Sequence, residues 1–406
     1  MLKTAPTYLQ YQEKLNNLKN TIMRIIIIII TLFLPFICLA QTLRGVVIDA
    51  DTNEPIAGAS VYLNGTTLGC NTDSEGHYSI KVNDIIYTQL VLSFMGYETV
   101  IIENPFELLP DTVYLKEKGF RVNEVTVKGR PTFSERQKMQ AFREQFLGVT
   151  PGGRACRILN EKDIRLVYDP KEHKLHGYTD VPIVVKNTHL GYHVKCELIQ
   201  FTLILGPQKS LHSKNTDTAQ TIITASFEEL PKINNFHHER RKDTYKYSKN
   251  RFFKLISKSD LINSELVILK DLQDKNLQTL LKQEQFFNVM KKKADESTIN
   301  IEVVPESKNI DGITSFVITE SSENNTNNFE NTMLNTVNIG KRYYGYKHVI
   351  YTHASTLFIN ADSFNVDSYG NTDLFFRLFI TGDMSRFRVG DQLPLDYLSD
   401  PTSIYH

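Results

Sequence analysis

The chain has 406 residues, 41% of them hydrophobic, which is enough for roughly two or three domains with real cores. Basic and acidic residues are equal in number, 46 each, so the formal net charge is zero. This composition excludes a disordered chain or a coiled coil, and it provides no global field that would attract nucleic acid.

The strongest signal is an apolar run over residues 25–37, which follows a basic residue. The residues three and one before the expected cleavage site, Cys38 and Ala40, are small, as signal peptidase requires. This pattern predicts a signal peptide over residues 23–40, cleaved between Ala40 and Gln41. Pro35 interrupts the run, which is shorter than the roughly 20 apolar residues of a membrane span. We therefore expect export by a diderm bacterium to the periplasm, the outer membrane or the cell surface.

Two features of this region leave alternatives open. Cys38 is a candidate for lipid attachment, but the bulky residues 35–37 before it disfavour a lipobox. Residues 1–22 are polar and charged and precede a natural start at Met23. We expect them to be an extension that the true precursor lacks.

Three cysteines remain after the predicted cleavage: Cys70, Cys156 and Cys196. The last two fall in the same predicted domain and could form a disulfide in an oxidising compartment. The alternative, kept open, is three unpaired buried thiols. The sequence has no CxxC, so it offers neither a redox motif nor a zinc ribbon.

Residues 42–117 alternate β-branched and polar positions in short segments separated by turn residues, which predicts a β-sandwich. The predicted strands are residues 43–49, 58–63, 77–82, 88–94, 99–103 and 111–115. Asp49, Asp51 and Asn53 are spaced like the start of a calcium loop, but the later glycine and glutamate are missing. A hairpin turn is the better interpretation.

Four ordered motifs in this segment resemble the carboxypeptidase regulatory-like domain. They are GVVID at 45–49, PIAGASVY at 55–62, NTDSEGHYS at 71–79 and SFMGY at 93–97. The resemblance implies a transthyretin-like (prealbumin-type) sandwich of a kind that precedes many exported proteins and TonB-dependent receptors. It also implies an accessory module for folding, spacing or docking, without peptidase chemistry.

Residues 118–148 form a predicted connector. Residues 123–129 resemble the short strand that follows this domain in TonB-dependent receptors, and residues 133–147 have apolar side chains at helical spacing. The residues that follow are too few for the barrel of a receptor, whose strands are each about 9–11 residues long.

Residues 149–400 predict an α+β domain with a mainly antiparallel sheet. The predicted strands are residues 164–168, 174–179, 182–186, 192–205, 221–227, 265–269, 300–304, 315–319, 347–351, 355–360 and 374–381. A basic helix is predicted at 235–257 and a polar loop at 321–331. Four short segments are FLG at 146–148, CRILN at 156–160, GY at 191–192 and QLPLDY at 392–397. Through them the region resembles, in outline, the C-terminal part of exported proteins that also carry the regulatory-like domain, a part of unassigned function.

No contiguous catalytic motif was found: the sequence lacks HxxE, HExxH and GxSxG. We expect surface roles for His173 and His176 and a helix start for His237 and His238. By the same reasoning, the acidic pairs Glu228/Glu229 and Asp362/Asp367 are expected to be surface acids. The basic segment 232–258 is expected to be a helix with one packed face and one solvated basic face, and contact with anionic envelope lipid or glycan is the alternative. No catalytic residue, metal ligand or cofactor is predicted.

The leading hypothesis is an exported, non-enzymatic binding or assembly protein of the envelope, whose partner is an envelope protein, a peptide or a glycan. Nucleic acid is excluded by export, and membrane contact is expected to be peripheral only. Two alternatives stay open. One is a peptidase-like envelope hydrolase with a dispersed site, and the other is an accessory partner of a TonB-dependent nutrient-uptake complex.

Overall fold

The computed structural model describes residues 19, 21–24, 41–119, 132–211, 216–258, 266–272, 277–280, 290–294, 299–303, 314–320, 354–374 and 377–398. The segments 123–129, 321–331 and 347–351, for which elements were predicted, lie outside these ranges. Of the predicted signal peptide, Met23 and Arg24 are described, and Ala40 is not. No helix in the described part is long and apolar enough to cross a membrane.

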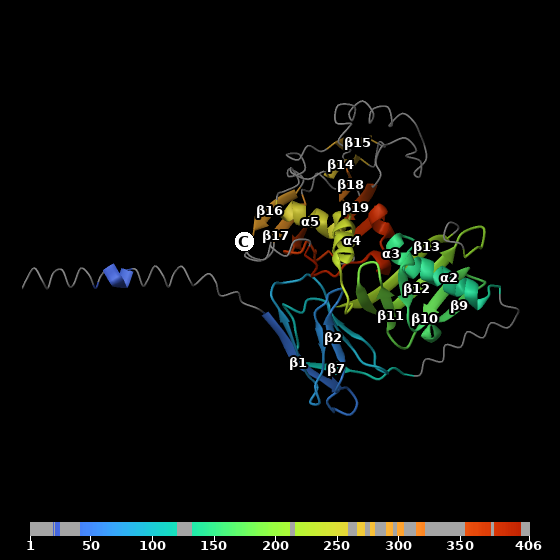
Figure 1. Cartoon of the computed structure of the whole chain (residues 1–406), viewed down its shortest axis with the longest axis horizontal. Coiled ribbons are helices and arrows are strands. Elements are labelled where there is room, and N and C mark those ends of the chain that lie inside the picture. Colours follow the sequence, from blue (N-terminus) through green and yellow to red (C-terminus); the bar gives the residue numbers. More distant parts are fainter. Residues whose placement is uncertain are drawn as a thin grey trace, which may run out of the picture.

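The first part of the described chain is a β-sandwich of two small sheets (Figure 1). One sheet has the order β4-β1-β7, and the other has the order β3-β2-β5-β6. Their bounds are β1 (Gln41–Asp49), β2 (Ser60–Leu63), β3 (Gly69–Asn71), β4 (His77–Val82), β5 (Leu90–Ser93), β6 (Val100–Ile102) and β7 (Thr112–Leu115). Exposed and buried residues alternate strictly along β4, so one face lies in the core between the sheets. The predicted all-β N-terminal fold is confirmed.

After the sandwich, helix α2 (Glu135–Phe146) begins at a capping box in which the Ser134 side chain accepts from the Gln137 backbone. Its apolar face carries Phe142 and Phe146, both almost fully buried. The ring of Phe142 lies 4.7 Å from that of Phe201, measured between centroids, which packs the helix onto the next sheet. The helix predicted over residues 133–147 is therefore present.

That sheet has six antiparallel strands, arranged around one long strand, β12 (Figure 1). One side of β12 pairs with β10 and β11 in succession, and its other side pairs with β13. The bounds are β8 (Cys156–Ile158), β9 (Arg165–Asp169), β10 (Lys174–Tyr178), β11 (Ile183–Asn187), β12 (Tyr192–Leu205) and β13 (Thr216–Glu229). The strand β8 pairs only with β11 among the described residues and so forms an edge.

The basic helix predicted over residues 235–257 is divided in two. Helix α4 (Asn235–Lys246) ends before Ser248, whose side chain accepts from the Arg251 backbone and starts α5 (Lys249–Ser257). When a serine side chain accepts a hydrogen bond from the backbone N–H three residues later, it caps the start of a new helix. This favours a break over continuation of the preceding helix. The break directs the apolar residues of α5 into a different core.

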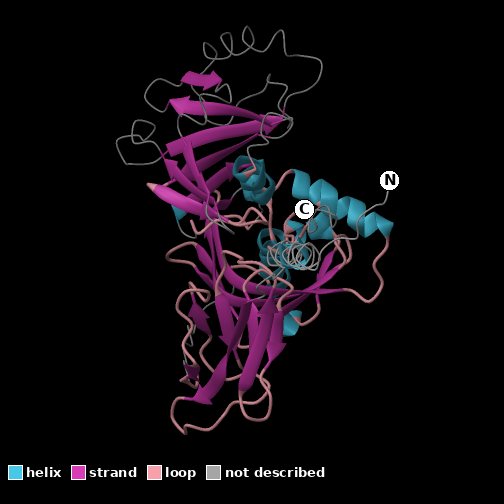
Figure 2. Cartoon of the chain, turned by 90° about the vertical axis from the view of Figure 1, so that its left-hand side faces the viewer, coloured by secondary structure: helices cyan, strands magenta, loops and turns pink. Residues whose placement is uncertain are grey.

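The last part contains two further sheets, with the orders β15-β14-β18-β19-β21 and β16-β17-β20. Their bounds are β14 (Leu266–Leu272), β15 (Leu277–Leu280), β16 (Met290–Ala294), β17 (Ile299–Val303), β18 (Thr314–Glu320), β19 (Ala354–Ile359), β20 (Ser363–Val366) and β21 (Leu378–Gly382). Phe252 and Phe253 of α5 pack with Phe364 and Leu357 in a core separate from that of the six-stranded sheet. Most helices lie on one side of the strands (Figure 2). The predicted α+β architecture with mainly antiparallel sheets is confirmed.

Two short elements fasten the end of the described chain to the six-stranded sheet. Helix α3 (Pro151–Arg154) lies against the turn η8 (Val389–Asp391) at glycines. A Cβ added to Gly390 would lie 2.4 Å from the Cα of Gly153, which no real side chain tolerates. The Nδ2 of Asn187 also donates to Gly390 O at 3.0 Å. Backbone therefore packs directly on backbone at this point.

Candidate functional site

The sandwich is joined to the six-stranded sheet by the turn between β2 and β3. Asn64 Oδ1 accepts from Ala225 N at 2.9 Å, and Gly65 N donates to Ala225 O at 2.6 Å. Phe227 N donates to Thr66 O at 2.9 Å. Gly65 has φ +75°, a backbone conformation that favours glycine. The turn thus adds a short parallel bridge to the edge of β13.

Side chains extend this junction on both sides of the turn. The Tyr62 hydroxyl and the Thr224 hydroxyl are hydrogen-bonded at 2.9 Å in a buried position, and burial raises the pKa of Tyr62. Ser93 Oγ donates to Glu197 Oε1 at 2.5 Å. Buried polar groups that all have partners fix one orientation of two packed surfaces. The sandwich is therefore held in one position.

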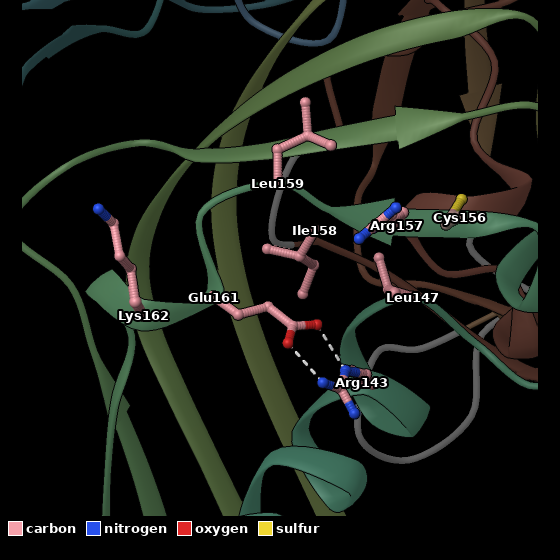
Figure 3. A pocket seen from close by; sticks show the side chains of 8 residues that line it. All are labelled: Arg143, Leu147, Cys156, Arg157, Ile158, Leu159, Glu161 and Lys162. Atoms are coloured by element: carbon pink, nitrogen blue, oxygen red, sulfur yellow. Dashed lines mark hydrogen bonds and ion pairs between the residues drawn. The ribbon is translucent and has the colours of Figure 1, made fainter.

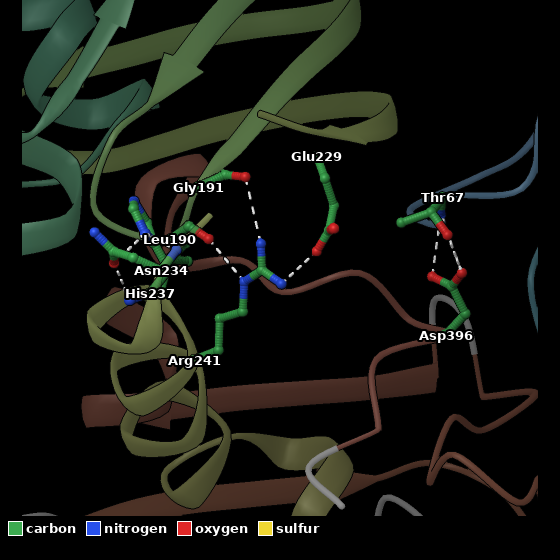
Figure 4. A network of polar contacts seen from close by, with 8 residues as sticks. All are labelled: Thr67, Leu190, Gly191, Glu229, Asn234, His237, Arg241 and Asp396. Carbon is green, nitrogen blue, oxygen red and sulfur yellow. Dashed lines mark hydrogen bonds and ion pairs between the residues drawn. The ribbon is translucent and has the colours of Figure 1, made fainter. Parts of the chain in front are cut away.

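A C-terminal segment, residues 395–397, completes the junction. Leu395 N donates to Gly65 O at 2.7 Å, and Asp396 accepts from the backbone and the hydroxyl of Thr67. Figure 4 shows the pair Thr67 and Asp396 beside the network of Arg241. Residues from the start and the end of the described chain thus meet in one place.

Asp367 is a second tie between the sandwich and the C-terminal part. Its Oδ2 accepts from Tyr87 N at 2.9 Å, and its Oδ1 accepts from the backbones of Tyr369 and Asn371. Burial raises the pKa of this carboxyl to about 6, against the effect of these donors. The predicted surface acid is instead an interior acceptor.

Arg241 of α4 lies at the centre of the polar network in Figure 4. Its Nε donates to Leu190 O at 2.8 Å, its Nη2 to Gly191 O at 3.3 Å and its Nη1 to Glu229 Oε1 at 2.5 Å. Only 3% of the residue is exposed. The guanidinium thus fastens α4 to the ends of β12 and β13, and this part of the basic segment is structural.

An open hollow lies between the end of α2 and the edge strand β8 (Figure 3). Its volume is about 630 Å³, and Leu147, Cys156 and Ile158 supply apolar lining. Its rim is charged: Arg143 donates to Glu161 through two nitrogens, while Arg157 and Lys162 also line it. Burial raises the pKa of the Cys156 thiol to about 12, so the thiol stays protonated near neutral pH.

The two cysteines of the expected disulfide are free thiols in this structure. Cys156 pairs opposite Asn187 and Cys196 opposite Ile183, on the two sides of β11. One intervening strand alone separates Cα atoms by about 9.5 Å, beyond the roughly 7 Å that a disulfide spans. The register contradicts the pairing and agrees with the alternative of unpaired thiols.

The remaining singled-out residues occupy structural positions. Asp49 Oδ1 accepts from the backbones of Asp51 and Thr52, which confirms the predicted turn. His173 has φ +54° between β9 and β10, and His237 caps the start of α4. No group of three or more metal-ligating side chains occurs within the described ranges.

The sequence offered few signals for the junction itself. Asn64-Gly65 is visible as a turn, but nothing local indicates that the turn pairs with β13, whose partner residue lies 161 positions away. The segment QLPLDY at 392–397 was noted only for its resemblance to other proteins, and it supplies Leu395 and Asp396.

With this geometry in view, residues 43–127 match the family model of the CarboxypepD_reg-like domain. The N-terminal sandwich is therefore a carboxypeptidase regulatory-like domain. The chain is also similar to the TonB-dependent receptor SusC of Bacteroides thetaiotaomicron, with 33% identity over 122 residues. This similarity covers 26% of the chain and 12% of the receptor, so the chain corresponds to only a small part of that protein.

Proposed function

We propose that this chain is an exported, non-enzymatic binding or assembly protein of the bacterial envelope, in which the regulatory-like domain is a docking module. The observation that carries the proposal is the junction at Asn64–Thr67, where the sandwich pairs with β13. A module on a flexible tether would sample many orientations, whereas this one presents a single composite surface together with the sheet. The family match of residues 43–127 supports an accessory role for it.

The similarity to a TonB-dependent receptor favours one kind of partner within this role. We propose that the chain acts beside a TonB-dependent uptake complex, as an accessory protein in the periplasm or at the outer membrane. The sandwich has exposed apolar side chains available for such contact. Met95 and Leu108 are each 73% exposed, and Tyr114 is 55% exposed.

Crosslinking and affinity capture from outer-membrane preparations tests the proposal. The native chain is expected to recover a TonB-dependent receptor, and a variant with Met95, Leu108 and Tyr114 changed to serine is expected to lose it. A matched control changes Ile199 and Ile222 to serine, which are 51% and 41% exposed on the six-stranded sheet. Equal capture by both variants would contradict docking through the sandwich.

The hydrolase alternative is tested separately. Purified protein is expected to leave peptidoglycan fragments, oligosaccharides and peptide libraries unchanged. Hydrolysis that a single point substitution abolishes would replace the binding role by an enzymatic one.

A further inference from the structure

The strand β1 begins at the residue that the predicted cleavage would leave as the mature N-terminus. Its bounds are Gln41–Asp49, and the signal peptide is expected to be cleaved between Ala40 and Gln41. No linker would therefore separate the new terminus from the sandwich. The strand is also the middle one of its sheet, which has the order β4-β1-β7, and Leu43 is only 4% exposed. Removal of residues 41 and 42 alone would thus reach the core.

The side chain of Gln41 is free to react, although its backbone is held in the sheet. The residue is exposed, and its side chain forms no hydrogen bond within the part of the chain that the structure describes. Its backbone lies opposite Val82 of β4. Val47 N donates to Gly76 O at 2.9 Å, and hydrogen-bonded pairs recur at every second residue of such a ladder. The backbones of Gln41 and Val82 therefore face each other as one of these pairs.

Release of the signal peptide would convert the amide nitrogen of Gln41 into a free amine, within reach of the side-chain amide of the same residue. The neutral amine can attack Cδ and form an N–Cδ bond, which closes a ring of the same size as that of proline. The Cδ–Nε2 bond then breaks, and Nε2 leaves as ammonia with a proton from the attacking nitrogen. The reaction is intramolecular, so it is favoured by proximity and needs no oxidant, reductant or second substrate.

We propose that Gln41 of the mature chain is converted to pyroglutamate, an uncharged lactam. The conversion removes the positive charge of a free N-terminus. The carbonyl of Gln41 takes no part in the reaction and keeps its place opposite Val82. An aminopeptidase needs a free α-amine, so the lactam protects the middle strand of the sheet from trimming. This inference rests on the proposed export of the chain and goes beyond its binding role.

Mass spectrometry of the mature N-terminus tests the proposal. The chain is produced with its signal peptide in a diderm host, purified from the envelope and incubated at neutral pH until its mass no longer changes. We expect an N-terminal peptide that begins at residue 41 and is lighter than its sequence predicts by one ammonia molecule. A peptide that begins at residue 41 with a free amine would overturn the proposal. A peptide that begins elsewhere would overturn the cleavage on which the proposal rests.

Gln41→Asn is the matched control, because it keeps a side-chain amide whose cyclisation would require a smaller, strained ring. This variant is expected to keep a free α-amine and to lose residues of β1 when an aminopeptidase is added, whereas the native chain keeps its mass. Equal trimming of both chains, or of neither, would overturn the protective role of the lactam. Receptor capture should be the same for the two chains, so a failure of the proposed docking is observed separately.

Discussion

The guanidinium of Arg241 lies over the ring of Tyr192, with Cζ 4.0 Å from the ring centroid. The same group donates to Leu190 O and Gly191 O, so one side chain holds a ring and two carbonyls together. A planar guanidinium can do both, because its faces and its edges contact different partners.

We therefore expect Arg241→Lys to lower the free energy of unfolding by about 2 kcal/mol. A lysine ammonium cannot stack on the ring and donate to both carbonyls at the same time. Urea denaturation followed by circular dichroism measures the change. The neighbouring control Arg240→Lys, at an exposed position of α4, should stay within about 0.5 kcal/mol of the native chain. An equal loss in both variants would argue against the network.

Asn64→Ala removes the acceptor of Ala225 N–H at the junction. Leaving a buried amide without an acceptor costs about 1–3 kcal/mol. In this variant we expect the cost to weaken the contact between the sandwich and the six-stranded sheet. The amide of Ala225 should exchange faster with deuterium, while the core of the sandwich keeps its protection. The control Asn83→Ala, at an exposed position, should alter neither the exchange at Ala225 nor the protection of the sandwich core. Unaltered exchange at Ala225 in Asn64→Ala would show that the turn does not hold the two parts together.

The buried carboxyl of Asp367 makes stability depend on pH in a defined direction. Burial raises its pKa in the folded protein to about 6, from an ordinary value of 3.8. Between these values the folded chain keeps a proton that the unfolded chain releases, so the stability contributed by Asp367 falls as pH rises from about 4 to about 6. The variant Asp367→Asn cannot titrate there. Native stability minus variant stability should decline across this window, and a constant difference would contradict the assignment.

The cysteines give a redox prediction. Cys196 is fully buried and burial raises its pKa, so a thiol reagent should leave it unlabelled in the native protein. Both Cys156 and Cys196 should become labelled after denaturation without reductant, and reductant should not shift the melting temperature. A peptide pair linked through these residues in a non-reduced digest would contradict the register of β11.

Elements with strong periodicity were predictable from sequence alone. The strand β4 alternates buried and exposed residues, and β12 was predicted with its observed bounds. The three-residue strands β3 and β8 are too short for any periodicity to appear. The break at Ser248 was missed because serine is tolerated within a helical pattern, and only its bond to the Arg251 backbone reveals a new start.

The candidate site was less predictable, because its contacts join distant parts of the chain. Tyr62 meets Thr224 across 162 positions, and Tyr87 meets Asp367 across 280. Local patterns place each residue on a strand or a turn and carry no information about its partner. The acid at 367 was predicted as a surface residue for this reason.

The hydrogen bond between Thr67 and Asp396 joins residues that are 329 positions apart in the sequence. It can therefore form only after almost the whole chain has been synthesised. Domains fold in order during synthesis at roughly 5–20 residues per second, and about 280 residues separate the last sandwich strand from Asp396, so the sandwich is complete roughly 14–56 s before Asp396 emerges. For that interval the turn at Asn64–Thr67 lacks its last tether. The nascent chain therefore passes through a state in which the sandwich is folded but not yet held by Asp396.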